Sequence, residues 1–401
     1  MKSRIAIGSF IGMIVSVYPI LFTSFPVLLQ PISAEFGWGR STLSLALLFT
    51  TTTATILYPF VGRALDRWGS RAILLPGFLA FGLAISALSL INGSTTQLFL
   101  LYILAGACST LTAGLAFGRA LSRAFESNRG LMLGVCLGVG GGLGAAIMPL
   151  YTHWLVEAFG WRGAFLGLAL APLLVGVPTV FFLIHESLRS SGAAAALVYG
   201  HHLKEALRSA NYWIVLAGIF IVNIVVGGLF GHFVAVASDL HVSSGTAASM
   251  LSAASVATLI GQFGIGIGLD RVKTPRLAFA TFAAILGGAL CIHHAHSAGL
   301  LFVGVVLIGL GSGSEYGLLP YFLTRLFGLR SFGQLYGIIY AASAVSYGLG
   351  PYVMGWTFDN LHSYQLAFIA FELALALGLA LLFGLRRYTY SPEGNLMQAA
   401  A

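Results

Sequence analysis

Long apolar runs, broken by short polar stretches, make up most of this chain. A helix that crosses the hydrocarbon layer of a membrane needs roughly 20 apolar residues. The runs here are continuous rather than alternating, which favours helices over the strands of a membrane barrel. The pattern predicts twelve spans, at about 5–30, 41–61, 72–91, 97–122, 131–156, 162–184, 212–237, 246–268, 277–297, 299–323, 332–356 and 361–385.

Composition supports an all-α membrane protein. The chain is 58% hydrophobic and only 8% charged, whereas soluble domains carry about 25% charged residues. With so little polar surface, lipid must cover the predicted helices. The first apolar run reaches about Leu29, which is too long for a cleaved signal peptide, so we interpret it as the first span.

The chain divides into two similar halves. Its longest polar interruption lies at 185–211, and the pattern Gly-x-x-Leu-Asp-Arg occurs once in each half, at 62–67 and at 266–271. The sequence therefore predicts a six-helix bundle over 1–185, a linker over 186–211, a second six-helix bundle over 212–388 and a tail over 389–401. In membrane proteins such repeats place a transport site between the halves.

Basic residues lie mainly on one side of the predicted spans. Of the 20 Lys and Arg residues, all except Arg40 and Arg162 fall on the side of the linker and the termini. Lys and Arg accumulate in cytoplasmic loops, so both termini are expected in the cytoplasm, with the protein in a bacterial inner membrane. The net charge of +8 is placed in these loops, which argues against a nucleic-acid partner.

The loop after the second span resembles a signature of the major facilitator superfamily. The family pattern Gly-x-x-x-Asp-Arg-x-Gly-Arg-Arg/Lys is matched by Gly62, Asp66, Arg67 and Gly69, although Ser70 replaces a basic residue before Arg71. Within the family, the stretches at 35–44, 160–165 and 315–325 are similar to bacterial monocarboxylate and oxalate–formate antiporters. The resemblance covers almost the whole chain.

The resemblance implies that the two Asp-Arg loops hold the cytoplasmic side closed while the outside is open. A carboxylate is stabilised at a helix N-terminus, and the arginines could pair with carboxylates or carbonyls of adjacent helices. Alternatively, these residues are only inside-positive loop charges. The expected gating residues are Gly62, Asp66, Arg67, Gly69, Arg71, Gly266, Asp270 and Arg271.

Ionisable residues inside spans are functional candidates because they are costly in lipid. The resemblance places Glu315, in the tenth span, on a central cavity, where desolvation would favour a neutral carboxyl that suits a proton carrier. Alternatively, Glu315 anchors a neighbouring helix. The resemblance places the twelfth span, which holds Glu372, outside the cavity, so Glu372 is expected to anchor a helix by a hydrogen bond. Arg119 is expected to extend to the membrane interface or to act in gating.

Neutral polar residues near the span midpoints are candidates for orienting a substrate in an otherwise apolar pocket. Each could equally be a contact between helices. These residues are Tyr18, Asn223, Tyr340, Ser343 and Tyr347, with Gln262 lower in the eighth span. His232, near the outer end of the seventh span, could titrate and take part in proton coupling.

Several function classes lack sequence support. There is no Walker-type Gly-Lys-Ser/Thr loop and no nucleophile elbow, so neither ATP hydrolysis nor another enzymatic activity is expected. Cys108, Cys136 and Cys291 all lie in apolar runs, so neither a disulfide nor a zinc site is expected. We expect no metal and no cofactor.

The sequence therefore predicts a secondary transporter that works by alternating access. Similarity to the branch implies a small organic monocarboxylate as substrate, coupled to protons or exchanged. Carriers of that kind usually have a basic residue in the eighth or eleventh span, but here Gln262 stands in the former and the latter has no Lys or Arg. Efflux of neutral or amphiphilic molecules is thus an alternative, and a non-transporting membrane sensor is another.

Overall fold

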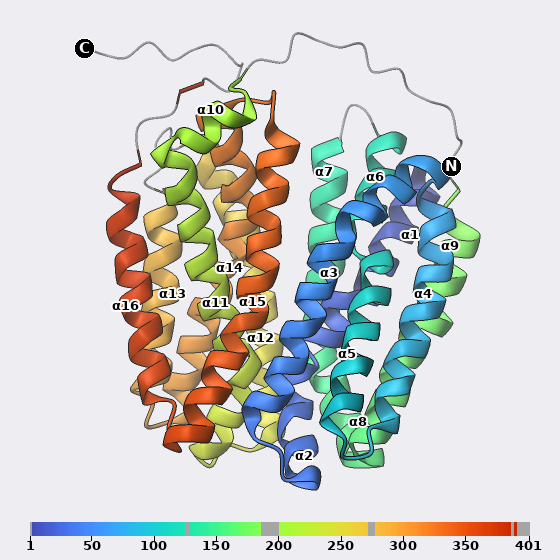
Figure 1. Cartoon of the computed structure of the whole chain (residues 1–401), viewed down its shortest axis with the longest axis vertical. Helices are drawn as coiled ribbons and strands as arrows, with labels where there is room; N and C mark the ends of the chain where they lie inside the picture. The colour runs from blue at the N-terminus through green and yellow to red at the C-terminus, as the bar shows by residue number, and fades with distance from the viewer. Residues whose placement is uncertain (1, 126–128, 186–199, 272–276, 386–388, 391–401) are drawn as a thin grey trace.

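The computed structural model describes residues 2–125, 129–185, 200–271, 277–385 and 389–390. Helices form nearly all of this part, and a single isolated β-bridge joins Gly200 to Gly328. The helices are arranged as two bundles that lie side by side (Figure 1). The predicted all-α membrane class is confirmed.

The N-terminal bundle contains short irregular turns between its α-helices. Its main elements are α1 (Lys2–Ile14), the π-helical turn η1 (Tyr18–Phe22), α2 (Phe25–Phe36), α3 (Arg40–Trp68), α4 (Ser70–Ala87), α5 (Thr95–Ser109), α6 (Gly114–Ala124), α7 (Arg129–Leu133), the π-helical turn η4 (Gly134–Val139), α8 (Gly140–Leu170), the π-helical turn η5 (Ala171–Gly176) and α9 (Val177–Leu183).

The C-terminal bundle has longer, unbroken helices and follows the short helix α10 (Leu203–Arg208). Its elements are α11 (Ala210–Asp239), α12 (Ser244–Arg271), α13 (Leu277–His293), α14 (Ala298–Phe327), α15 (Phe332–Leu361) and α16 (Gln365–Leu382).

The helices agree with the twelve predicted spans. Within the described residues, nine segments are long and apolar enough to cross a membrane. One of them, 131–183, holds two predicted spans, because α8 breaks at Gly160, whose φ of 68° favours glycine. The remaining two spans are α13, which is only 17 residues long, and α15, whose many Gly, Ser and Tyr residues lower its hydropathy.

Each bundle has its own hydrophobic core. One core draws almost entirely on residues 5–184 and the other on residues 206–385. Small residues bring the helices close together inside each bundle. A Cβ on Gly313 of α14, for example, would collide with the carbonyl of Thr258 on α12. The helices within each half are therefore tightly packed.

The two ends of the molecule differ. At the end that carries α10 and the start of α1, here called the terminal end, the bundles separate; at the opposite end, here called the closed end, they meet (Figure 1). Cβ atoms on Gly62, Gly134, Gly333 or Gly337, toward the terminal end, would meet no atom of the described residues within 4 Å. At the closed end, a Cβ on Gly355 would lie 2.7 Å from backbone atoms of Ser41 in the other bundle.

Candidate functional site

Aromatic side chains line the boundary between the two bundles. The rings of Tyr18, at the start of η1, and Tyr347, on α15, have centroids 6.5 Å apart, and Phe22 meets Tyr347 edge-on at 5.7 Å. Further along α15, Tyr340 contacts Tyr58 of α3 at 6.2 Å. We call these five residues the aromatic seam. Tyr18, Tyr340 and Tyr347 are thus placed where the two halves face each other, and Tyr340 is 46% exposed.

The other neutral polar candidates occupy different settings. The side chain of Gln262 on α12 reaches the N-terminal bundle. A Cβ placed on Gly138 of η4 would lie 2.7 Å from the Nε2 atom of Gln262. The hydroxyl of Ser343 instead donates to the carbonyl of Ile339 in its own helix, at 2.9 Å. Gln262 therefore lies at the bundle boundary, whereas Ser343 satisfies its hydrogen bond locally.

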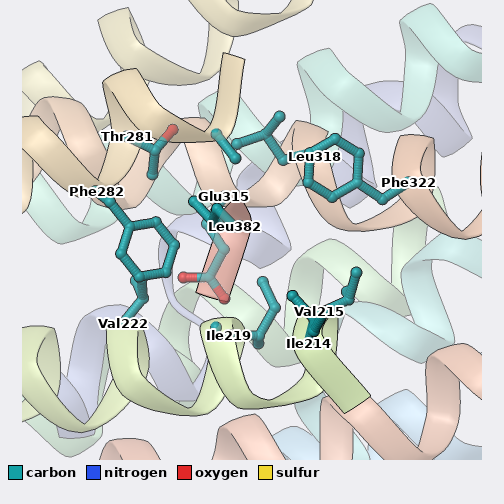
Figure 2. Close-up of a pocket in the computed structure, with 12 residues that line it drawn as sticks. Ile214, Val215, Ile219, Val222, Thr281, Phe282, Glu315, Leu318, Phe322 and Leu382 are labelled. Atoms are coloured by element: carbon teal, nitrogen blue, oxygen red, sulfur yellow. The ribbon is translucent and has the colours of Figure 1, made fainter. Parts of the chain in front are cut away.

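Glu315 and Asn223 are brought together inside the C-terminal bundle. The Asn223 amide of α11 donates to Glu315 Oε1 at 2.6 Å and also to the Ile219 carbonyl at 2.9 Å. Glu315 borders a cavity of about 30 Å³, enough for roughly one water molecule. Figure 2 shows the carboxyl of Glu315 directed toward the helix that carries Ile219, with Phe282 beside it.

The direction of Glu315 differs from the expectation drawn from the resemblance. Its cavity is lined by residues of α11, α13 and α14 and by Leu382, and none of them comes from the N-terminal half. The reason is helical spacing, since Gly311 and Glu315 lie one turn apart on one face. A Cβ on Gly311 would lie 3.0 Å from the Thr281 carbonyl of α13, so this face of α14 is turned into its own bundle.

A second polar group lines the same cavity. The Thr281 hydroxyl is buried and has no hydrogen-bond partner within the described part of the chain. A buried hydroxyl without a partner is costly, so a water molecule in this cavity would stabilise it. The site thus combines a carboxyl, an amide donor and a hydroxyl in apolar surroundings.

The Asp66 loop is tied to its own bundle. Asp66 Oδ1 lies 3.6 Å from Arg119 Nε, with the Asp66 side chain 84% exposed and that of Arg119 13% exposed. Arg71 donates to the Phe181 carbonyl at 3.0 Å, and Arg67 lies over the Trp68 ring. Arg119 therefore extends toward the terminal end and meets the loop there.

Glycines give this loop its shape and its open side. Gly69 joins α3 to α4 with a φ of 82°, a conformation that disfavours other residues, and a Cβ on Gly62 would meet no described residue within 4 Å. The second copy of the motif lies in the last turns of α12. The surroundings of Gly266 and the side chains of Asp270 and Arg271 lie outside the described part of the structure, so the gating role of both copies stays a prediction.

Glu372 has the helix-anchoring contact that its position in the twelfth span predicts. Its Oε1 atom lies 2.8 Å from Nδ1 of His293, which joins α16 to α13. Neither helix contributes to the aromatic seam.

The structure contains a polar network at the closed end that the sequence did not predict. Arg40, at the start of α3, binds both carboxylate oxygens of Asp239 at 3.0 and 3.1 Å, and Asp359 accepts hydrogen bonds from the backbone N–H groups of Arg40 and Ser41 at 2.8 Å. These bonds join the two bundles. The sequence contained one signal for this network, since Arg40 and Arg162 are the only basic residues predicted on the outer side. In the structure both have acidic partners: Arg40 pairs with Asp239 at 3.0 Å, and Arg162 pairs with Glu35 at 2.6 Å.

Comparison with known protein families decides the assignment. The model of the Major Facilitator Superfamily matches residues 6–291 and 230–399, which together span nearly the whole chain. The chain belongs to the major facilitator superfamily. It is therefore an integral membrane protein and a secondary transporter of small molecules.

Relatives within the major facilitator superfamily cover most of the chain. Monocarboxylate transporter 12 of Mus musculus is 26% identical over 331 residues, covering 73% of this chain and 68% of that protein. An MFS-type transporter of Gibberella moniliformis is 27% identical over 356 residues, covering 85% and 79%. The resemblance to the monocarboxylate branch is confirmed by these relatives.

Solved structures of other transporters share the fold. A bacterial homolog of the human lysosomal transporter Spinster, in an inward-facing and occupied conformation, matches with a TM-score of 0.72 at 15% identity, covering 98% of both chains. A mutant of the nucleoside transporter NupG matches with a TM-score of 0.77 at 11% identity, covering 96% of this chain and all of that one. At these identities the match supports the twelve-helix fold alone.

Proposed function

We propose that this transporter carries a small organic monocarboxylate by alternating access, together with a proton or in exchange for another acid. The named relatives support the substrate class, since monocarboxylate transporters of several vertebrates match most of the chain. The bundle 1–185 would rock against the bundle 212–388. The linker 186–211 joins the two bundles, and the tail 389–401 follows the second one.

The membrane orientation follows from the basic residues. All except Arg40 and Arg162 belong to the side of the linker and the termini, so we place the terminal end in the cytoplasm and the closed end outside a bacterial inner membrane. With this orientation, the separation of the bundles at the terminal end corresponds to an inward-open state.

The aromatic seam and Gln262 are the proposed substrate contacts. They lie where the halves face each other, near the middle of the helices. The spans that carry Gln262 and Tyr347, 246–268 and 332–356, contain no Lys or Arg to balance a carboxylate. The substrate would therefore be bound in this region by the hydroxyls of the tyrosines and the amide of Gln262, with the co-transported proton held by the protein.

The observation that carries proton coupling is the Glu315–Asn223 pair. The Asn223 amide donates to Glu315 Oε1 at 2.6 Å in otherwise apolar surroundings, so a carboxylate formed there on loss of the proton would keep a hydrogen-bond donor. Because the carboxyl is directed into the C-terminal bundle, it would hold a proton without competing with the substrate for the seam.

A second candidate function is efflux of neutral amphiphilic molecules. The same aromatic lining, with no Lys or Arg in spans 246–268 and 332–356, favours it. Aromatic rings bind flat apolar molecules well.

Transport by the purified protein in liposomes tests the proposal. We expect lactate or pyruvate to accumulate inside when the interior is more alkaline than the exterior, beyond the level in protein-free liposomes, which measures passive entry of the acid. Pyruvamide, the uncharged amide, is the matched control and should not accumulate. Movement of amphiphilic dyes with no accumulation of either acid would favour efflux and contradict the monocarboxylate proposal.

A further inference from the structure

The closed end contains a ring of hydrogen bonds that passes through His232. Arg40 of α3 donates to the Tyr364 hydroxyl at 2.5 Å, and that hydroxyl lies 2.9 Å from His232 Nδ1. His232 Nε2 lies 3.0 Å from Ser44 Oγ, and Ser44 donates to the Arg40 carbonyl at 2.8 Å. Arg40 and Ser44 belong to the N-terminal half, and His232 and Tyr364 to the C-terminal half. We call these four residues the closed-end ring.

The donors in this ring fix the state of the imidazole. Ser44 uses its proton on the Arg40 carbonyl, so its oxygen must accept from His232 Nε2–H. The Tyr364 oxygen already accepts from Arg40, so its hydroxyl proton is directed at His232 Nδ1. Since a neutral imidazole donates from one nitrogen and accepts at the other, the ring is satisfied by neutral His232.

The surroundings of His232 oppose a second proton. The side chain is fully buried, at 0% exposure, and the Arg40 cation faces it from α3. The carboxylates of this network, Asp239 and Asp359, both bind Arg40, whereas the Pro351 carbonyl of α15, which also faces the ring, is an acceptor that acts in the opposite sense and favours a second proton. A proton on Nδ1 would point a donor at the Tyr364 hydroxyl and add a cation beside Arg40, and burying an unpaired charge is costly.

Opening of the closed end would change the surroundings that determine whether His232 is protonated. If the bundles separate, α3 carries Ser44 and Arg40 away, and His232 remains on α11. The imidazole then loses its neighbouring cation and faces water, where an unperturbed histidine titrates near pH 6.5.

We propose that His232 is a proton sensor of the closed end, and that the two bundles can meet there only after His232 has lost its proton. This inference rests on the proposed alternating access and adds a pH-sensitive step to it. Acid on the closed-end side would hold that end open, and neutral pH would let it close. His232 is a positioning residue in this account, because it acts on the contact between bundles and not on the substrate.

The size of the pH effect on the open-to-closed ratio depends only on the titration of His232 in the open state. For a group that titrates near 6.5 when open and stays neutral when closed, lowering the pH from 8 to 5.5 multiplies the open-to-closed ratio by about ten.

Distance measurements between spin labels test the proposal in the full chain reconstituted in membranes. Labels at the exposed residues Thr96 and Ala298, in a background without Cys108, Cys136 and Cys291, report the separation of the bundles at the closed end. The wild type should show the longer-distance population gaining about tenfold over the shorter one between pH 8 and 5.5. His232→Gln, which keeps a donor and an acceptor but cannot be charged, should show no such gain.

Two further variants keep the test decisive. His153→Gln alters another histidine at the bundle boundary, bonded to Glu157 at 3.4 Å, and should keep the pH response. If His232→Gln fails to fold, Ser44→Ala provides the second test, because it removes the Nε2 acceptor and should raise the longer-distance population already at pH 8. A response that persists in His232→Gln or vanishes in His153→Gln would overturn the proposal. A wild type that carries solute in liposomes but shows no pH response would overturn it too, while leaving the transport proposal standing.

Discussion

Asp359 gives the sharpest test of how the closed end is held together. This residue of α15 caps a helix of the other bundle, since its two carboxylate oxygens accept from the backbone N–H groups of Arg40 and Ser41 at 2.8 Å, and one of them also accepts from the Ser41 hydroxyl at 2.5 Å. Gly39, the residue before α3, has no side chain to make such a cap. The first turn of α3 therefore depends on the C-terminal bundle for its cap.

The cost of removing this cap can be worked out from the contacts. Loss of an N-cap carboxylate costs about 1 kcal/mol, and loss of its interaction with the helix dipole costs up to about 1 kcal/mol more. Asp359→Ala should thus weaken the closed state by about 2 kcal/mol, because neither interaction survives when the bundles separate. At 1.4 kcal/mol for each factor of ten, the open-to-closed ratio rises about 30-fold.

The spin-label distance between Thr96 and Ala298 measures this ratio at pH 8. Asn360→Ala is the matched control, since Asn360 follows Asp359 on the same helix and, among the described residues, its amide donates to the Trp356 carbonyl of its own helix, at 2.8 Å. The control should keep the wild-type distribution. A wild-type distribution in Asp359→Ala, in a protein that still opens in other conditions, would show that this cap does not hold the bundles together.

Three further predictions concern topology, gating and packing. Cysteine placed at Asn92 should react with an impermeant thiol reagent added outside intact cells, and cysteine at His201 should not; the reverse pattern contradicts the orientation. Asp66→Asn should impair liposome transport at near-normal expression and shift the protein toward opening at the terminal end, and unchanged flux and accessibility would show that this loop is no latch. Gly313→Ala should lower the melting temperature strongly, because its methyl group would meet the Thr258 backbone, and an unchanged melting temperature would contradict that packing.

Hydrophobic pattern was sufficient to predict the fold, because the bilayer restricts a spanning chain to very few structures. The positions of the helices follow the apolar runs even where the helices are irregular. The pattern could not predict the π-helical turns η1 and η4, where the chain deviates locally from regular α-helix. Such deviations depend on packing between helices, which the order of apolar residues does not encode.

The candidate site was predictable in its residue types but not in its contacts. Glu315 was singled out because a carboxyl in a span is costly, yet the direction of its side chain depends on the rotation of α14, which packing of glycines against α12 and α13 determines. Its partner Asn223 was recognised only as a polar residue at mid-span. Arg40 was interpreted as a loop charge, since its bonds to Asp239 and Asp359 join residues from opposite halves of the chain.

The variant Glu315→Gln shows whether Glu315 couples protons to transport. The amide keeps the shape of the side chain and can still accept from Asn223, but it cannot release a proton. Glu372→Gln is the matched control, a spanning acid bonded to His293 within the same bundle. The measurement is accumulation of labelled lactate in liposomes under a pH gradient, beside exchange of lactate at equal pH on both sides. We predict that Glu315→Gln abolishes the accumulation and keeps part of the exchange, while Glu372→Gln keeps both; normal pH-driven accumulation in Glu315→Gln would contradict the account.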